Sequence, residues 1–90
     1  VVVCDRPNPI NGTDVEGAAL KKSCRSFCGY TPVLNRHGLT IGELALVYQH
    51  GFGEGEDRRE PFPCKLDIIR CDGWERGQYL DETDLPWILP

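Results

Sequence analysis

The pattern of apolar and polar stretches along the 90-residue chain predicts two short strands. Residues Val1 to Cys4 form a β-branched apolar run, which is typical of a buried strand. Two prolines, Pro7 and Pro9, follow and end regular strand pairing. Residues Lys65 to Cys71 hold three large aliphatic side chains and predict the second strand.

A helix is predicted between these strands. Thr40 and Glu43 have the spacing of a capping box, in which each side chain accepts a hydrogen bond from the other residue's backbone N–H. Gly51 follows His50 and marks the expected end of the helix. The apolar residues of the segment then fall near one helical face, namely Ile41, Leu44, Ala45 and Tyr48.

The remaining segments carry weaker patterns. Residues 18–22 suggest a helical turn and residues 26–30 a short strand. Residues 51–63 are rich in glycine and charge and are bounded by prolines, so we expect a flexible surface loop there. Trp87, between Pro86 and Ile88, is expected to be a core residue.

The order strand, helix, strand predicts an α/β fold built on a βαβ unit. We expect part of a Rossmann-like parallel or mixed sheet with a crossover helix. Ligands of such sheets bind beyond the carboxyl ends of the strands. Residues 5–6 and 74–76 follow the two strands and are expected to border one cleft. Both chain ends are apolar, so we interpret residues 1–90 as a single segment of a larger domain.

Charge and cysteine content narrow the classes of function. The chain has 10 basic and 14 acidic residues, a net charge of −4, which argues against nucleic-acid binding. No apolar run is long enough to span a membrane. An odd number of cysteines, 5, favours a reducing compartment. Their spacing lacks a C-x-x-C pair, so we expect neither a metal site nor a cofactor.

Two polar clusters are candidates for ligand binding. Asp5, Arg6 and Asn8 lie among prolines that would hold a ligand clamp rigid, although the same residues could form a turn that closes the strand. Arg36 and His37 lie just before the predicted helix, whose N-terminus favours anions. The alternative for this second cluster is an ordinary surface loop.

Several carboxylates could carry acid–base chemistry. Asp5, Glu16 and Glu43 are candidates, because glycoside hydrolysis uses a pair of carboxylates. Glu43 has an alternative role in the capping box, and Glu16 could be a solvated loop residue. Trp74 and Arg76 could offer a sugar-stacking surface and a carboxylate partner, or Trp74 could anchor the core.

An ordered set of motifs points to a family. The chain resembles the bacterial exo-β-N-acetylmuramidases, long catalogued as a domain of unknown function. Their members are several times longer and combine a Rossmann-like N-terminal domain with a smaller C-terminal one. The resemblance rests on Asp5-Arg6-Pro7-Asn8-Pro9-Ile10, Val15-Glu16-Gly17, Arg36-His37-Gly38-Leu39-Thr40-Ile41-Gly42-Glu43-Leu44-Ala45, Gly73-Trp74-x-Arg76 and Leu85-Pro86-Trp87.

The resemblance implies a glycoside hydrolase that releases N-acetylmuramic acid from the non-reducing end of peptidoglycan fragments. This chain would be the second half of the Rossmann-like part, would pack against other parts of its parent protein and would be inactive alone. The alternative is a non-catalytic carbohydrate- or anion-binding module. The family pattern has Met at position 39, where this chain has Leu, an apolar replacement.

The resemblance also assigns roles to the candidate residues. The three carboxylates become candidates for acid–base or positioning work. The family acts on cell-wall material, which implies the cell envelope or export, whereas the cysteine count favours the cytoplasm. The residues expected to bind the substrate, including its lactyl carboxylate, are Arg6, Asn8, Arg36, His37, Trp74 and Arg76.

Overall fold

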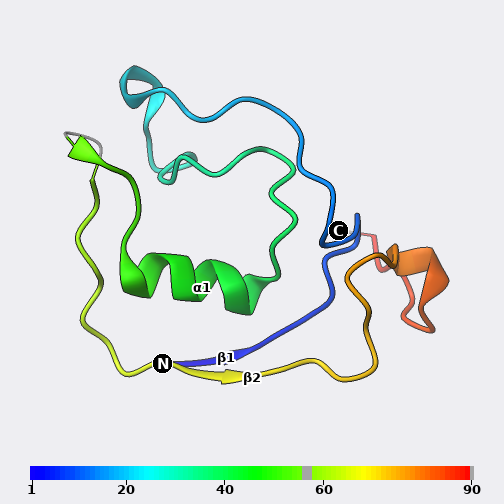
Figure 1. The fold of residues 1–90 in the computed structure, drawn as a ribbon. Coiled ribbons are helices and arrows are strands. Elements are labelled where there is room, and N and C mark those ends of the chain that lie inside the picture. The colour runs from blue at the N-terminus through cyan, green and yellow to red at the C-terminus, as the bar shows by residue number, and fades with distance from the viewer. Residues whose placement is uncertain (56–57, 90) are drawn as a thin grey trace.

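A computed structural model describes residues 1–55 and 58–89 and shows a βαβ unit (Figure 1). Strand β1, Val2–Cys4, and strand β2, Asp67–Ile69, pair in parallel, and helix α1, Ile41–His50, connects them. The expected α/β crossover arrangement is therefore confirmed. The register pairs Val2 with Asp67, Val3 with Ile68 and Cys4 with Ile69.

Helix α1 begins and ends where the sequence predicts. The Thr40 hydroxyl accepts a hydrogen bond from the Glu43 N–H at 3.2 Å, and the Glu43 carboxylate accepts one from the Thr40 N–H at 3.0 Å. These two bonds satisfy backbone donors that the first helical turn leaves unpaired. Gly51 ends the helix with a φ of 79°, a conformation that favours glycine.

The helix lies close to strand β1 because Gly42 has no side chain. A Cβ atom at this position would lie 2.8 Å from Cγ of Asp5 and 2.9 Å from Cγ2 of Ile68. Both distances are shorter than a van der Waals contact. Gly42 thus sets the distance between the first turn of α1 and the sheet.

The sheet has one covered and one open face. Val3 and Ile68 are half-buried on the side of α1, whereas the residues that alternate with them are exposed. The expectation of a buried first strand is thus wrong for the described residues: Val2 is 64% exposed and Ile69 58%. No described element covers this second face, and no hydrophobic residue in the described ranges is fully buried.

Two minor expectations are also corrected. The only regular structure near residues 18–22 is the 3-10 helix η1, Lys22–Cys24. Residues 26–30 form a turn instead of a strand. The Ser26 hydroxyl accepts hydrogen bonds from the N–H groups of Cys28 and Gly29, so the side chain satisfies donors that a strand would need.

The loop between α1 and β2 packs against the end of the helix. Within the predicted loop 51–63, residues 56–57 lie outside the described residues, and Phe52 pairs with Arg59 in an antiparallel bridge. Aromatic rings pack the loop and the preceding segment against the end of α1. The rings in contact are Tyr30, Tyr48, Phe52 and Phe62.

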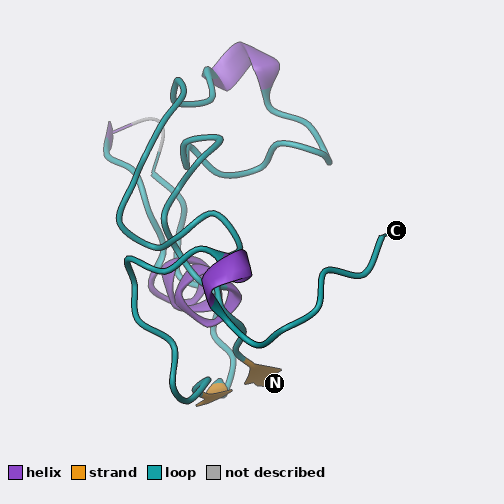
Figure 2. Cartoon of the chain, turned by 90° about the vertical axis from the view of Figure 1, so that its right-hand side faces the viewer, coloured by secondary structure: helices purple, strands orange, loops and turns teal. Residues whose placement is uncertain are grey.

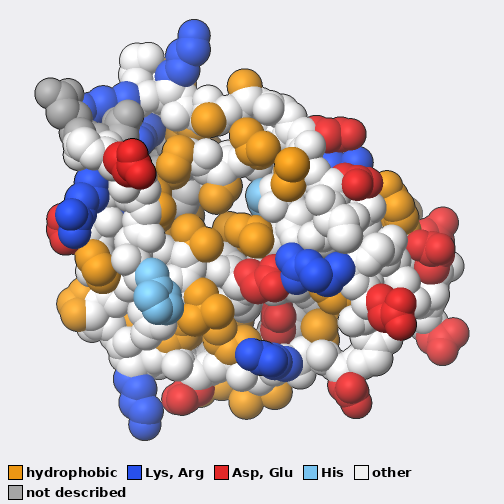
Figure 3. Space-filling view, in the orientation of Figure 1, with side chains coloured by type: hydrophobic (Ala, Val, Ile, Leu, Met, Phe, Trp, Pro, Cys, Tyr) orange, Lys and Arg blue, Asp and Glu red, His pale blue; other side chains and the backbone are white. Residues whose placement is uncertain are grey.

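The chain after β2 forms a separate arm. It leads to the short 3-10 helix η3, Leu80–Glu82, and the final residues run away from the body of the molecule (Figure 2). Acidic side chains gather around this arm on the right of the space-filling view, and hydrophobic side chains are exposed across the middle (Figure 3). The arm is tied to the loop that follows β1, because the Leu80 N–H donates to the carbonyl of Pro9 at 3.1 Å.

Candidate functional site

Asp5, at the carboxyl end of β1, binds the beginning of α1. Its Oδ2 accepts the Thr40 hydroxyl at 2.8 Å, and its Oδ1 accepts the Gly42 N–H at 2.8 Å. A carboxylate is well placed at a helix N-terminus, because the unpaired N–H groups there carry partial positive charge. The carboxylate therefore fastens the strand to the helix.

Asn8 joins the two polar clusters that the sequence singled out. The side chain is almost buried, at 8% exposure, and its amide donates to the carbonyl of Leu39 at 3.0 Å. Its Oδ1 accepts the Ile10 N–H at 3.1 Å, which is the turn expected as one alternative. Asn8 thus closes the loop after β1 and also holds it against the segment before α1.

Glu43 and Arg76 form a two-pronged ion pair. The Arg76 guanidinium donates to both Glu43 oxygens, at 2.6 and 3.1 Å, and to the Gly38 carbonyl at 3.1 Å. The Arg76 hydrogen bonds hold the pKa of the Glu43 carboxyl below its usual range. The loop after β2 is thereby fixed to the first turn of α1.

Arg36 is the centre of a second network. Its Nη2 donates to the Tyr79 hydroxyl at 2.8 Å, the Ile10 carbonyl at 2.8 Å and Asp14 Oδ2 at 3.0 Å. Its Nη1 lies 3.3 Å from Oε1 of Glu16. The hydrogen bond with Tyr79 is the main cause that raises the pKa of Arg36. Most of this cation's donors are therefore used within the chain.

His37 has one ring nitrogen committed and one available. Its Nδ1 accepts the backbone N–H of Leu39 at 3.0 Å, so a neutral ring carries its proton on Nε2. The ring is half-buried and lines the cavity described below. His37 can therefore donate a hydrogen bond to a ligand.

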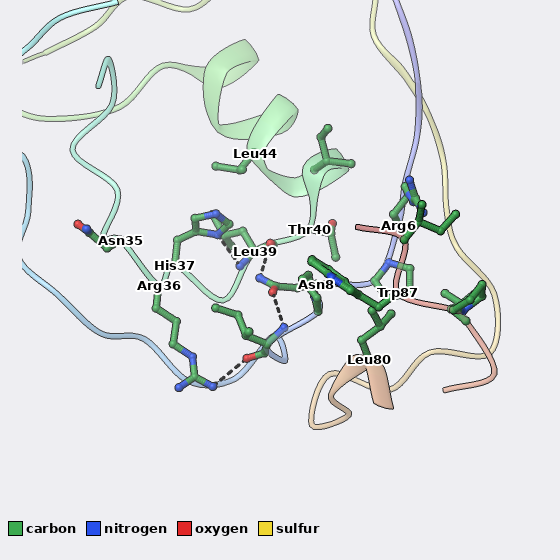
Figure 4. A pocket seen from close by; sticks show the side chains of 17 residues that line it. Arg6, Asn8, Asn35, Arg36, His37, Leu39, Thr40, Leu44, Leu80 and Trp87 are labelled. Carbon is green, nitrogen blue, oxygen red and sulfur yellow. Dashed lines mark hydrogen bonds between the residues drawn. The ribbon is translucent and has the colours of Figure 1, made fainter. Parts of the chain in front are cut away.

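A cavity of about 670 Å³ opens beside these residues at the carboxyl end of β1 (Figure 4). Arg6, Trp87 and Leu80 lie on one side of the view, and His37 and Leu44 on the other. The wall is mostly apolar with a few polar groups, as is usual for ligand sites. The residues that line it are Arg6, Pro7, Asn8, Pro9, Ile10, Asn35, Arg36, His37, Leu39, Thr40, Ile41, Leu44, Leu80, Leu85, Pro86, Trp87 and Ile88.

The cavity brings together some of the predicted site residues. Four of the expected substrate-binding residues line it, namely Arg6, Asn8, Arg36 and His37. None of the three candidate carboxylates does. Asp5 and Glu43 hold the helix start from outside it, and Glu16 lines a second, more open cavity of about 710 Å³ beside Arg36 and Tyr79.

Trp74 takes the anchoring position that was one of its two expected alternatives, whereas Trp87 differs from its expected position. Trp74 does not line the cavity; its ring packs against Gly12, and its Nε1 donates to the Gln78 carbonyl at 3.4 Å. Neither described cavity is lined by both segments, so the single cleft between residues 5–6 and 74–76 stays a prediction. Trp87, expected in the core, is 65% exposed on the cavity wall. No described residue packs over it to form a core at that end of the chain.

Two further features concern metals and membranes. Within residues 1–55 and 58–89, no group of three His, Cys, Asp or Glu side chains is arranged to hold a metal ion, and the five cysteines are unpaired. No helix in the same residues combines the length and apolar composition that a membrane span needs.

A βαβ unit with a cavity at the carboxyl end of its first strand defines a segment of an α/β domain, and ligands of such domains bind at this end of the strands. Comparison with protein-family models identifies the family of this domain. The chain belongs to the family described as "Exo-beta-N-acetylmuramidase NamZ, N-terminal", whose model matches residues 1–90. The family expected from the sequence motifs is confirmed.

Two relatives support this assignment. The peptidoglycan β-N-acetylmuramidase NamZ of Bacillus subtilis is 37% identical over 89 residues, which cover 99% of this chain and 20% of the relative. The crystal structure of a DUF1343 family protein from Bacteroides fragilis is 34% identical, with a TM-score of 0.79 over 97% of this chain and 21% of that one. The chain thus spans about a fifth of each relative.

Proposed function

We propose that this chain is a segment of an exo-β-N-acetylmuramidase that releases N-acetylmuramic acid from the non-reducing end of peptidoglycan fragments. It would supply the second half of a Rossmann-like domain and one wall of the substrate cleft. The family match supports the activity. The observation that carries the proposal is the cavity, which combines an apolar wall with the side chains of Arg6 and His37.

Arg6 and His37 are the groups suited to the lactyl carboxylate of the sugar. Arg6 is exposed, and its guanidinium bonds to no side chain or carbonyl among the described residues. Its planar fork matches a carboxylate with two parallel hydrogen bonds. His37 would add a donor through Nε2. Asn8 and Arg36 shape the same wall, and hydrogen bonds within the chain hold both side chains in place.

The three carboxylates act as positioning groups in this proposal. Asp5 and Glu43 fix the start of α1, and that start follows directly on His37 in the chain. Glu16 pairs with Arg36 by its side chain and by a backbone bridge. The acid that protonates the leaving group would then come from another part of the enzyme, across the cleft.

The open sheet face indicates where the rest of the enzyme packs. Val1, Val2 and Ile69 are exposed apolar residues on or beside a sheet of only two strands. A sheet this small is not expected to be stable alone, and its edges have unpaired backbone groups. We propose that further strands extend it and that other elements cover its second face.

The test is steady-state hydrolysis of a chromogenic N-acetylmuramic acid glycoside by the full-length enzyme. Removing one charge-assisted hydrogen bond is worth about 10- to 100-fold in KM. We expect Arg6→Ala to raise KM by that factor and His37→Ala by about tenfold or less. Arg58→Ala, which removes an exposed arginine paired with Glu60, is the matched control and should leave KM unchanged.

Two results would contradict the proposal. If the unsubstituted enzyme released no N-acetylmuramic acid, the assigned activity would be wrong. If it was active but both variants kept the original KM, the binding site would be assigned to the wrong residues. Binding of the sugar without turnover would favour the non-catalytic module instead.

A further inference from the structure

Trp87 is the most exposed aromatic side chain on the cavity wall, and the contacts proposed for Arg6 and His37 do not involve it. Its exposure is 65%, whereas Trp74 is half-buried against Gly12. Exposing a large indole ring to water is unfavourable unless something covers it. The position of Trp87 on the cavity wall makes it a candidate for contact with a ligand.

The surroundings of Trp87 define the chemistry of that ligand. Leu85, Pro86 and Ile88 are neighbours of Trp87 in the chain and line the same cavity, as does Arg6. The indole ring of Trp87 is 65% exposed, and its Nε1 can donate a hydrogen bond. An apolar surface, an indole ring and an arginine side chain thus line the same cavity (Figure 4).

We propose that Trp87 is the platform on which the pyranose ring of the substrate stacks, with the carboxylate of that sugar directed to Arg6. A pyranose has a face of C–H groups that suits a flat aromatic ring, and hydroxyls at its edge that suit the Nε1 donor. The negative charge of an acidic sugar complements Arg6. This inference rests on the proposed function and adds a specificity-determining residue to it.

A structural alternative gives different results. If another part of the enzyme covered Trp87, the residue would be a packing anchor, and its truncation would lower thermal stability. A sugar platform depends on the flat ring instead of on apolar volume. Phe should therefore replace Trp87 well and Leu poorly, while the thermal midpoint stays nearly unchanged in both variants.

The experiment compares Trp87→Phe and Trp87→Leu in the full-length enzyme. The readouts are KM and kcat on the chromogenic glycoside, the calorimetric Kd for free N-acetylmuramic acid, and the thermal midpoint. We expect the Leu variant to weaken KM and Kd about tenfold, and the Phe variant about threefold or less. Phe27→Leu, at a fully exposed aromatic residue outside the cavity, is the control and should change none of them.

Two outcomes would overturn the inference. Equal, unchanged Kd values for the Phe and Leu variants would show that the ring does not touch the sugar. A lowered thermal midpoint with unchanged Kd would assign Trp87 to packing. The calorimetric measurement also separates this inference from the proposed function, because an enzyme that binds the sugar without hydrolysing it would contradict only the assigned activity.

Discussion

Asp5 receives hydrogen bonds from Thr40 and Gly42, and Glu43 is bonded to Thr40 and Arg76, so the residues nearest the helix start are bound to one another. The capping box could be predicted from spacing, because it needs only residues three apart. The bonds of Asp5 could not, since they join positions 35 and 37 residues apart in sequence and depend on the fold. Residue types alone thus left both a catalytic and a structural role open for Asp5 and Glu43, and the contacts place both side chains at the helix start.

The Glu43–Arg76 pair leads to a prediction about pH. The pKa of Glu43 is lowered in the folded state, so the pair stabilises the fold above the usual carboxyl pKa. That stabilisation is lost as the pH falls through the lowered value. Glu43→Gln keeps the capping box but removes the ion pair, and we expect a loss of about 0.5 kcal/mol at neutral pH, because the pair is partly screened by solvent.

The measurement is the thermal midpoint of the full-length enzyme and its Glu43→Gln variant at neutral and at acidic pH. The difference between the two proteins should be small at neutral pH and should disappear once Glu43 is protonated. A difference of the same size at both pH values would contradict the ion-pair account.

At the scale of elements, helix α1 is the part of the fold that the sequence predicts best. Its cap, its apolar face and its terminal glycine are all local signals, and the structure confirms its bounds. Residues 26–30 show the opposite case: their apolar content suggested a strand, but Ser26 bonds to the local backbone and forms a turn. The composition of a segment does not show whether a side chain will take the backbone hydrogen bonds that a strand would need.

The contact between α1 and the sheet leads to a second prediction. Gly42→Ala would gain helix propensity of up to about 1 kcal/mol, but its Cβ would overlap Asp5 and Ile68 at a cost of about 1–3 kcal/mol. We expect a net destabilisation on the order of 1 kcal/mol, measured as a lower thermal midpoint. Gly77→Ala, where a Cβ would meet no atom within 4 Å, is the control. A stabilising effect of Gly42→Ala would show that the helix lies farther from the sheet.

At the scale of the whole molecule, the crossover order and the parallel pairing follow from the sequence pattern and are confirmed. The exposure of Val2, Ile69 and Trp87 does not follow from it, because an apolar residue in a sequence indicates burial without naming what covers it. The cavity likewise depends on where the last segment lies relative to the loop after β1, which is tertiary information.

The open sheet predicts how the 90 residues behave when produced alone. No hydrophobic residue among the described ones is fully buried, so the chain should unfold with little cooperativity on heating and should bind a hydrophobic dye. It should also be inactive on the chromogenic glycoside. A sharp thermal transition, or measurable turnover by the isolated chain, would show that it does not need the packing partners proposed above.

The most direct test of the central claim is substrate discrimination by Arg6. The claim is that this cavity recognises an acidic sugar through its carboxylate. The measurement is kcat/KM of the full-length enzyme and its Arg6→Ala variant on two chromogenic glycosides, one of N-acetylmuramic acid and one of N-acetylglucosamine, which lacks the lactyl group. We predict that Arg6→Ala lowers the preference for the acidic sugar by about 10- to 100-fold. An unchanged preference in an active variant would contradict the account.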